Sequence, residues 1–506
     1  MTHPILRVKG FRLPAEQKLL KSKMYWIAIL YFSEGFPLGV FYDLFPVQFR
    51  QQGVSLSKIG FLSLLGLSWT LKFLWAPAID LYRHHRRWMF VADVLMGLVT
   101  IVFAIATGFG AWVWIAVACF TLLSATNDIA IDGYTIELLK KNELGLANGL
   151  RIGFYRVGML ASGFILILSD IVSWSGAYLM TAGLLCLSGA ICLRAPKERV
   201  HSARKSVSLF GEIKGIIRYP PALGIMLLFF SGTIWLIDNV TKWSEVVPFF
   251  WTALLGVAAL LYVAGVLTGR TKKNLNKKRA LSAFTDGPMF GTLMEMIQRP
   301  YFAPVILFIL TFKLADSSMG FMIKPFWVDA GFTAKQIGFV SVNIGLGMSI
   351  LGGIAGGWYT DRTNIFKSLW LLGLFQAISN LGYALAAAII PIQQLGVMIP
   401  FQHRALVYSA SAIESFTGGL GTAAFLAFLM AIVNKQHSAT EYALLSSVFA
   451  LSRSFAGWAG GFGAESLGFA SYFLLTFFLA FPAYLLLPWV KKVLQNQTFE
   501  PKSIKA

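Results

Sequence analysis

The sequence predicts an all-α integral membrane protein made of two pseudo-symmetric six-helix bundles with two extra helices between them. Three observations lead to this fold class: an apolar composition, an internal repeat, and basic residues gathered in alternate loops. Of the 506 residues, 57% are hydrophobic and 13% are charged, and the mean hydropathy is +0.67. A soluble domain could not bury so much apolar surface, so we expect the chain to lie in a membrane.

The internal repeat relates two segments of similar sequence. Residues 53–63 (GVSLSKIGFLS) return as residues 331–341 (GFTAKQIGFVS), an offset of 278. Each copy opens an apolar run of membrane length that ends in an aspartate followed by basic residues. Parallel duplication of a helical bundle builds carriers whose site lies between the halves. The repeat therefore predicts a membrane transporter with a central site.

A spanning helix needs roughly 20 apolar residues, and this length sets the expected spans. The first bundle is expected to contain spans 24–49, 57–80, 88–108, 110–139, 145–169 and 175–193, and the second spans 301–328, 334–359, 366–390, 404–433, 438–465 and 469–489. Two further apolar runs, 221–238 and 246–268, lie between the bundles. The total is about fourteen transmembrane helices, grouped as six, two and six.

These spans divide the chain into regions. The predicted regions are a cytoplasmic N-terminal segment (1–23), the first bundle (24–194), a cytoplasmic loop (195–220), the inserted helix pair (221–268), a second cytoplasmic loop (269–300), the second bundle (301–490) and a cytoplasmic tail (491–506). Twelve helices suffice for paired bundles, so we expect the inserted pair at the periphery. We also expect a monomer.

The basic residues predict the orientation. The formal net charge is +20, and about 32 of the 43 Lys and Arg residues fall in alternate loops, against about five on the opposite side. By the positive-inside rule, both termini are cytoplasmic. The basic stretch 270–279 is expected to contact anionic membrane lipids, and a regulatory or nucleic-acid role is the alternative; we expect no nucleic-acid partner.

Motifs for metal, nucleotide or nucleophilic chemistry are missing from the sequence. The cysteines Cys119, Cys186 and Cys192 fall within predicted spans and form no CxxC pair. No metal-ligand spacing, phosphate-binding loop or catalytic triad signature occurs. We therefore expect no metal, no cofactor other than a proton gradient, and a transporter rather than an enzyme. Because the six histidines lie in loops or at helix ends, a proton carrier within the membrane must be a carboxylate.

Ionisable residues inside the spans are the strongest functional candidates, because burying a charge in hydrocarbon costs several kcal/mol. Asp128 and Asp132 lie at positions i and i+4 on one face of the fourth span. Two carboxylates so close repel each other, which favours proton binding by one of them and suits proton coupling. The alternative is permanent pairing with Arg151 or Arg156 on the next span, and both arrangements can hold in different conformations.

Glu34 and the pair Lys313–Asp316 are further charges within spans. Glu34 lies mid-span beside Gly and Pro, where a broken helix is tolerated if it lines a cavity. It is a third candidate for proton coupling, and the alternative is a neutral acid hydrogen-bonded to a neighbouring helix. Lys313 and Asp316 lie at i and i+3, so they either pair locally or act on the substrate or in gating.

Lys72 and Arg453 complete the charges of interest. Lys72 can bury its stem and reach a carboxylate or a substrate anion. Arg453 repeats in the second half the position of Arg156, 297 residues earlier, and a run of small residues follows each. Small residues permit close helix approach, so we expect these runs to pack and Arg453 to be a charge partner like Arg151 and Arg156.

Two clusters of an aspartate followed by arginines resemble the cytoplasmic motif of the major facilitator superfamily. They are Asp80, Arg83, Arg86 and Arg87 in the first half, and Asp361 and Arg362 in the second. The resemblance implies the major facilitator fold and a cytoplasmic gate formed by these residues.

More specifically, the chain resembles the AmpG-type muropeptide permeases over all twelve core spans. The motifs that carry the resemblance include residues 35–38 (GFPL), 72–77 (KFLWAP), 155–159 (YRVGM), 313–316 (KLAD), 418–425 (GGLGTAAF) and 438–446 (SATEYALLS). Two positions depart from that family. Asn127 stands where its members usually have Gln, and Glu34 stands where they more often have a small residue.

The resemblance implies import of N-acetylglucosaminyl-1,6-anhydro-N-acetylmuramic acid, with or without its stem peptide. The import would be proton symport across the bacterial inner membrane, serving peptidoglycan recycling. Some siderophore importers and the eukaryotic acetyl-coenzyme A transporters look related, so those two cargoes are alternatives. From other classes, the alternatives are a membrane-embedded transferase, which need not be duplicated, and a sensor that moves nothing.

A glycan or glycopeptide offers hydroxyls and a carboxylate, which polar side chains within the spans would bind. The candidate substrate contacts are Asn127, Asn343, Asn380, Ser415, Thr417, Lys72, Lys313, Asp316, Glu414 and, for stacking on sugar rings, Tyr42, Trp69, Trp327 and Tyr383. For each aromatic the alternative is ordinary packing or interface anchoring. In the expected mechanism the halves rock around the site, and protonation of Asp128 or Asp132 releases its arginine partner.

Overall fold

The computed structural model describes residues 23–72, 84–106, 110–138, 144–196, 296, 299–392, 399–433 and 438–498. The chain divides into two compact units, one formed by Met1–Val200, Ala303–Val433 and Leu445–Ala506, the other by His201–Phe302 and Asn434–Leu444. Every contact discussed below lies within the first unit. The inserted pair predicted at 221–268, and the motif residues Asp80 and Arg83, lie outside the described residues.

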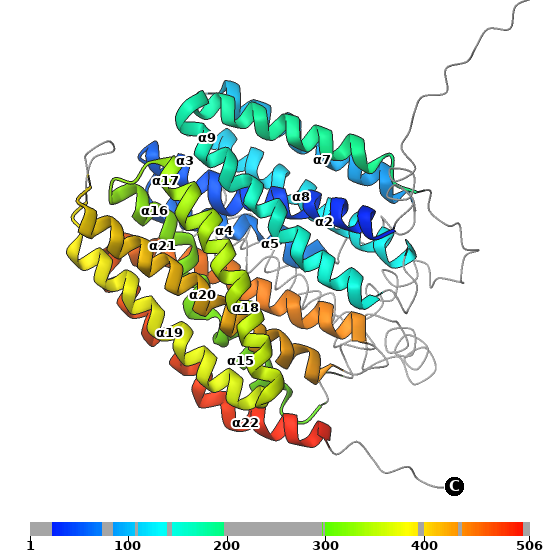
Figure 1. Ribbon diagram of the computed structural model, residues 1–506, viewed down its shortest axis with the longest axis vertical. Coiled ribbons are helices and arrows are strands. Elements are labelled where there is room, and N and C mark those ends of the chain that lie inside the picture. Colours follow the sequence, from blue (N-terminus) through cyan, green and yellow to red (C-terminus); the bar gives the residue numbers. More distant parts are fainter. Residues whose placement is uncertain are drawn as a thin grey trace, which may run out of the picture. The chain divides into compact units, whose positions relative to one another are not determined.

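The first half begins with one long, interrupted helix (Figure 1). It consists of α2 (Lys23–Gly39), the π-helical η1 (Val40–Leu44) and α3 (Phe45–Gln51). The helices that follow are α4 (Leu56–Leu65), α5 (Leu67–Leu71), α7 (His85–Ile105), α8 (Ala111–Leu138) and α9 (Leu144–Cys192). Helix α9 is kinked at Ser173, whose φ is 64°, and it supplies the fifth and sixth spans.

The second half repeats this order. Its helices are α15 (Phe302–Phe312), α16 (Leu314–Asp329), α17 (Ala334–Gln336), the π-helical η4 (Ile337–Ile344), α18 (Gly345–Arg362), α19 (Ile365–Ile389), α20 (Phe401–Ile432), α21 (Ser438–Phe478) and α22 (Phe481–Thr498). Helix α21 is kinked at Gly468, as α9 is at Ser173.

The described helices match the twelve predicted core spans. In the part of the chain that the structure describes, nine helical segments are long and apolar enough to cross a membrane, and the two kinked ones, Gly153–Cys192 and Leu445–Gln495, are 40 and 51 residues long. Each of these two has the length of two spans. The shorter apolar helix Leu56–Leu71 corresponds to the second span. Among the described residues there is no strand, and the all-α membrane fold predicted from the sequence is confirmed.

Within the first half, α2 packs against α9, and α7 packs against both α8 and α9, as the blue to cyan helices of Figure 1 show. Glycine lets α2 and α9 approach closely. A Cβ added to Gly35 would overlap the backbone of Tyr155, and one added to Gly158 would overlap the carbonyl oxygen of Phe32. The small-residue run after Arg156 therefore serves helix packing, as predicted.

The repeated segment ends the first long helix of each half in the same way. Gly53 and Gly331 have φ of +78° and +88°, a conformation that favours glycine. The amide of Val54 donates to the carbonyl of Phe49 at 3.0 Å, and the second half repeats this bond. Such a bond across a left-handed glycine is the Schellman cap of a helix C-terminus. The repeat thus encodes a helix stop.

The same repeat supplies two related crossings between the halves. A Cβ on Gly60 of α4 would lie 2.7 Å from Cα of Gly461 on α21. Its counterpart Gly338, 278 residues later, packs on α9, where an added Cβ would lie 2.6 Å from the carbonyl oxygen of Gly163. Each glycine therefore brings the second span of its half against the fifth span of the other half.

Replacing Gly338 by Val is expected to lower the free energy of unfolding by about 1–3 kcal/mol, because the side chain must push α9 away. Thermal unfolding of the purified protein measures this loss. The matched control is Gly347→Val on α18, where an added Cβ meets no atom within 4 Å. The control is expected to change stability by about 0.5 kcal/mol or less. Equal losses in the two variants would contradict the requirement for glycine at the crossing.

Candidate functional site

A cluster of ion pairs lies inside the first half. Lys72, which follows α5, places its Nζ 2.7 Å from Oδ2 of Asp128 and 3.8 Å from Oδ2 of Asp132. Nη2 of Arg151 lies 3.0 Å from Oδ1 of Asp132, and the hydroxyl of Tyr31 donates to the same oxygen at 2.9 Å. Because the two aspartates are one turn apart on α8, they share Lys72.

The partners differ in part from those predicted. Asp132 pairs with Arg151, as expected, but Asp128 pairs with Lys72 and not with Arg151 or Arg156. The aspartates therefore have the ion-paired arrangement that the sequence left as one of two alternatives. Spacing along α8 predicted their common face, whereas the cation that faces Asp128 comes from a distant part of the chain.

Glu34 lies one turn beyond Tyr31 on α2 and is 9% exposed. Its charge interacts with those of Asp128, Asp132 and Arg151. Its Oε2 has no hydrogen-bond partner among the described residues, and its carboxyl forms no direct ion pair with any of their cations. Among the described residues, Glu34 therefore has no cation of its own.

A fourth carboxyl, Asp93 on α7, is completely buried and was missed by the sequence analysis. Ser33 donates to its Oδ2 at 2.8 Å, and Nδ2 of Asn127 donates to its Oδ1 at 2.9 Å. Adjacent residues of α2 and α8 therefore face opposite sides: Ser33 and Asn127 face Asp93, while Glu34 and Asp128 face the ion pairs. The rule that singles out ionisable residues within spans would also have found Asp93.

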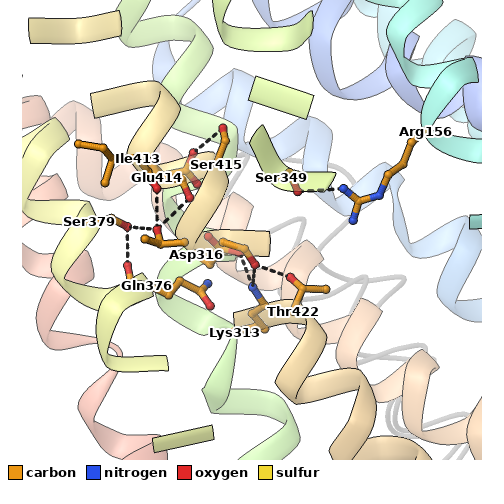
Figure 2. A network of polar contacts seen from close by, with 12 residues as sticks. Arg156, Lys313, Asp316, Ser349, Gln376, Ser379, Ile413, Glu414, Ser415 and Thr422 are labelled. Atoms are coloured by element: carbon orange, nitrogen blue, oxygen red, sulfur yellow. Dashed lines mark hydrogen bonds and ion pairs between the residues drawn. The ribbon is translucent and has the colours of Figure 1, made fainter. Parts of the chain in front are cut away.

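A second polar cluster lies on α16 and α20 (Figure 2). Nζ of Lys313 is 3.0 Å from Oδ2 of Asp316 and donates to the carbonyl of Gly418 at 3.3 Å. Lys313 is only 2% exposed, so the local pair, one of the two alternatives predicted, is enclosed and anchored to α20. Ser415 donates to Glu414 at 3.3 Å, and Glu414 has no ion pair among the described residues.

The predicted polar contacts of the second half fall into two groups. Thr417 donates to Ser379 at 2.8 Å beside the Lys313 cluster. Asn343, on η4, is half-buried, and neither side-chain polar atom has a partner among the described residues. Asn380 instead is 1% exposed and donates to Thr476 at 3.2 Å, so it joins two helices away from any open surface.

The four aromatic residues predicted to contact the substrate differ in burial. Tyr42 and Trp69 are half-buried, and their rings stack at 6.5 Å between centroids. Trp327 and Tyr383 are fully buried in the hydrophobic core, where the indole N–H of Trp327 donates to the hydroxyl of Tyr383 at 3.2 Å. Trp327 and Tyr383 thus have the packed arrangement given as the alternative, and Asn127 is also buried, at 1% exposed.

Outside the first-half cluster, two ion pairs of the described residues join one half to the other. Arg50 binds Asp329 through Nε at 2.6 Å and Nη2 at 2.5 Å, at the ends of α3 and α16 opposite the N-terminus. Asp43 on η1 lies about two helical turns before Arg50, and Nζ of Lys324 is 3.3 Å from its Oδ1. Ser162 of α9 donates to the other oxygen of Asp43 at 3.3 Å. The sequence analysis missed Asp43, although it too is a charge within a span.

At the end where Arg50 binds Asp329, a carboxylate of each half caps a helix N-terminus of the other half. Glu465 on α21 accepts from the backbone amide of Ser57 at 2.7 Å, and Asp170 on α9 accepts from that of Lys335 at 2.9 Å. Ser57 and Lys335 correspond in the repeat. A carboxylate is favourable at a helix N-terminus, so the two caps reinforce the glycine crossings. The end predicted to be extracytoplasmic is therefore closed between the halves.

The repeated arginines cross between the halves as well. Nη1 of Arg156 on α9 donates to the hydroxyl of Ser349 on α18 at 2.9 Å (Figure 2). The guanidinium of Arg453 on α21 lies 4.0 Å from the ring centroid of Tyr42. Both arginines are half-buried.

The described residues of the predicted cytoplasmic gate lie at helix ends. Arg86 donates to the carbonyls of Leu193 and Ala195, at 3.2 and 3.0 Å, and Arg87 is exposed. Asp361 and Arg362 are exposed at the end of α18, where Arg362 stacks on Trp358 at 4.2 Å. These contacts stay within one half, and the gating role remains a prediction.

Comparison with known proteins fits this architecture. The family model described as "Major Facilitator Superfamily" matches residues 27–267. The fold resembles solved major facilitator structures, among them the POT family transporter PepTSo, with a TM-score of 0.62 at 12% identity over 97% of this chain and 99% of that one.

The chain is thus similar to the major facilitator superfamily.

Individual relatives are similar to this chain over nearly its whole length. The anhydromuropeptide permease of Escherichia coli (strain K12) is 26% identical over 93% of this chain and 80% of that protein. An uncharacterised protein of Haemophilus influenzae is 27% identical over 95% and 97% of the two chains. A Rickettsia conorii protein named transporter AmpG 4 is 23% identical over 94% and 98%. The chain is thus a multi-pass membrane transporter for a small molecule, not an enzyme.

Proposed function

We propose that this transporter imports cell-wall anhydro-muropeptides, with or without the stem peptide, by proton symport across the bacterial inner membrane. The observation that carries the proposal is the 26% identity with the Escherichia coli anhydromuropeptide permease over 93% of the chain. A monomer with both termini in the cytoplasm is part of the proposal. The half-buried Tyr42–Trp69 stack and the polar groups Asn343, Ser415 and Thr417 suit a glycan.

Proton coupling is supported by counting charges in the first-half cluster. Four carboxyls, Glu34, Asp93, Asp128 and Asp132, face two cations, Lys72 and Arg151. Among the described residues, these cations pair with Asp128 and Asp132, and neither Glu34 nor Asp93 has a counter-charge there. An uncompensated carboxylate at this depth costs several kcal/mol, which favours the protonated acid.

We assign the transported proton to Glu34. Asp93 is enclosed by Ser33 and Asn127, whereas Glu34 borders the ion pairs that tie together α2, α8 and α9. The titratable and charged groups that face Glu34 are Asp128, Asp132, Arg151, Lys72, Tyr31 and Tyr155. When Glu34 loses its proton, its charge competes with both aspartates for the same two cations. Gain or loss of the proton would thus change the ion pairs of Lys72 and Arg151, and through them the packing of the helices that carry these residues.

Uptake by proteoliposomes tests the cargo. The protein is reconstituted, a proton gradient is imposed, and uptake of the labelled anhydro-disaccharide is measured with unlabelled disaccharide, a siderophore or acetyl-coenzyme A as competitor. We expect uptake that only the unlabelled disaccharide abolishes. Absence of disaccharide uptake, or displacement by one of the other two cargoes alone, would contradict the proposed substrate.

A further inference from the structure

Arg156 and Arg453 carry positive charge that no described carboxylate neutralises. Five other cations within the described spans each pair with a carboxylate: Arg50, Lys72, Arg151, Lys313 and Lys324. Arg156 instead contacts the hydroxyl of Ser349, and Arg453 contacts the ring of Tyr42. A guanidinium stays charged in proteins, so each keeps a positive charge at membrane depth that no carboxylate of the described residues matches.

The two arginines are related by the internal duplication. They lie 297 residues apart, on the fifth span of each half, and each reaches a residue of the opposite half. Arg156 follows Tyr155, whose backbone contacts Gly35, and Arg453 contacts Tyr42. Gly35 and Tyr42 lie seven residues apart on the first long helix, so the two arginines meet this helix at positions about 10 Å apart along its axis. One small anion would not bridge such a spacing, but an elongated acidic molecule would.

The surroundings of Arg453 favour a sugar acid. Tyr42, under its guanidinium, stacks on Trp69, and both rings are half-buried. An aromatic face packs against the apolar face of a sugar ring, and a guanidinium binds a carboxylate through paired hydrogen bonds. Ser349 offers a hydroxyl beside Arg156 for a second polar group of the same ligand.

We propose that Arg156 and Arg453 form a two-point site for the acidic groups of the transported molecule, so that the carrier selects sugar acids over neutral sugars. In this site the sugar ring packs against Trp69 beside the Arg453–Tyr42 pair, a carboxylate binds Arg453, and a second acidic or carbonyl oxygen binds Arg156. The identity of the acid rests on the proposed function, whereas the arginine site itself does not.

The test compares an acid with its amide. Binding of the anhydro-disaccharide with a free lactyl carboxylate, and of its lactyl carboxamide, is measured on the full-length protein in nanodiscs. Parent protein is expected to prefer the acid by about 10–100-fold. Arg453→Gln and the double variant Arg156→Gln/Arg453→Gln are expected to lose that preference, and Arg453→Lys to keep part of it. The control Arg404→Gln, a half-buried arginine at the start of α20, is expected to retain it.

Two outcomes would overturn the site. One is a double variant that still prefers the acid. The other is an equal loss of affinity for acid and amide, which would mark the arginines as structural.

A second experiment, without muropeptide, tests the arginine site independently of the proposed substrate. Thermal stabilisation of the parent by glucuronate, but not by glucose, and its loss in the double variant would support the arginine site even if no muropeptide bound. Equal stabilisation by glucuronate and glucose, or stabilisation by inorganic phosphate or phosphatidylglycerol alone, would contradict a sugar-acid site. Muropeptide binding that does not depend on the arginines would refute this inference and leave the proposed function standing.

Discussion

Replacing Glu34 by Gln is expected to abolish accumulation driven by a proton gradient while exchange of labelled for unlabelled substrate continues. The amide keeps the shape and neutrality of the protonated acid but carries no proton across the membrane. One coupled proton supports about a tenfold accumulation per pH unit, and about 2.3 kcal/mol per 100 mV of membrane potential. Uptake into proteoliposomes, with and without the gradient, measures both activities.

Two further variants separate coupling from structure. Glu414→Gln removes a half-buried glutamate of the second half that has no ion pair among the described residues, and it is expected to leave accumulation intact. Asp128→Asn leaves Lys72 without its nearest partner, so it is expected to impair accumulation and exchange alike. Full gradient-driven accumulation by Glu34→Gln would exclude Glu34 as the proton carrier, and its loss in Glu414→Gln would move the assignment to the second half.

Replacing Lys324 by Gln is expected to open the end of the protein that is predicted to be extracytoplasmic. The side chains of Lys324 and Asp43 are only 16% and 6% exposed, and their ion pair joins the two halves. Removing one partner of a buried pair costs about 3–5 kcal/mol, because it leaves the other charge unpaired. In the carrier this cost falls on the closed state, so the population shifts toward the open one by more than about 100-fold.

A single cysteine at Ala334 reports the opening, because Ala334 is 1% exposed next to the cap at Lys335. In a variant without the native cysteines, labelling by a membrane-impermeant thiol reagent is expected to accelerate with Lys324→Gln. The charge swap Asp43→Lys/Lys324→Asp is expected to restore slow labelling. Lys335→Gln serves as control, because the cap uses its backbone amide. Slow labelling in Lys324→Gln would contradict a closing role for the pair.

Patterns along the chain predicted what is local. The repeat indicated that the two halves share a fold, and in the structure its two copies form the same helix stop, at Gly53 and at Gly331. Spacing of i and i+3 predicted that Lys313 and Asp316 could pair, and spacing of i and i+4 placed Asp128 and Asp132 together. In each case the geometry of one helix fixes the relation, so no knowledge of neighbouring helices is needed.

Contacts between different helices could not be predicted from residue spacing within one helix. Which cation faces Asp128 depends on how α5 and α9 pack around α8, and the sequence carries no direct signal of that choice. Likewise, a polar or aromatic residue in a span faces either the core or the space between the halves. Trp327 and Tyr383 face the core, whereas Tyr42 and Trp69 are half-buried, although all four looked alike in the sequence. Asp43 and Asp93 could have been found, since each is a lone charge in an apolar run.

The most direct measurement is proton movement that accompanies substrate entry. Proteoliposomes with a pH-sensitive dye inside receive the anhydro-disaccharide from outside, with no gradient imposed. We predict internal acidification that requires both the substrate and Glu34. Uptake of the disaccharide without acidification, in the protein with all its intramembrane carboxyls intact, would contradict a proton-coupled carrier.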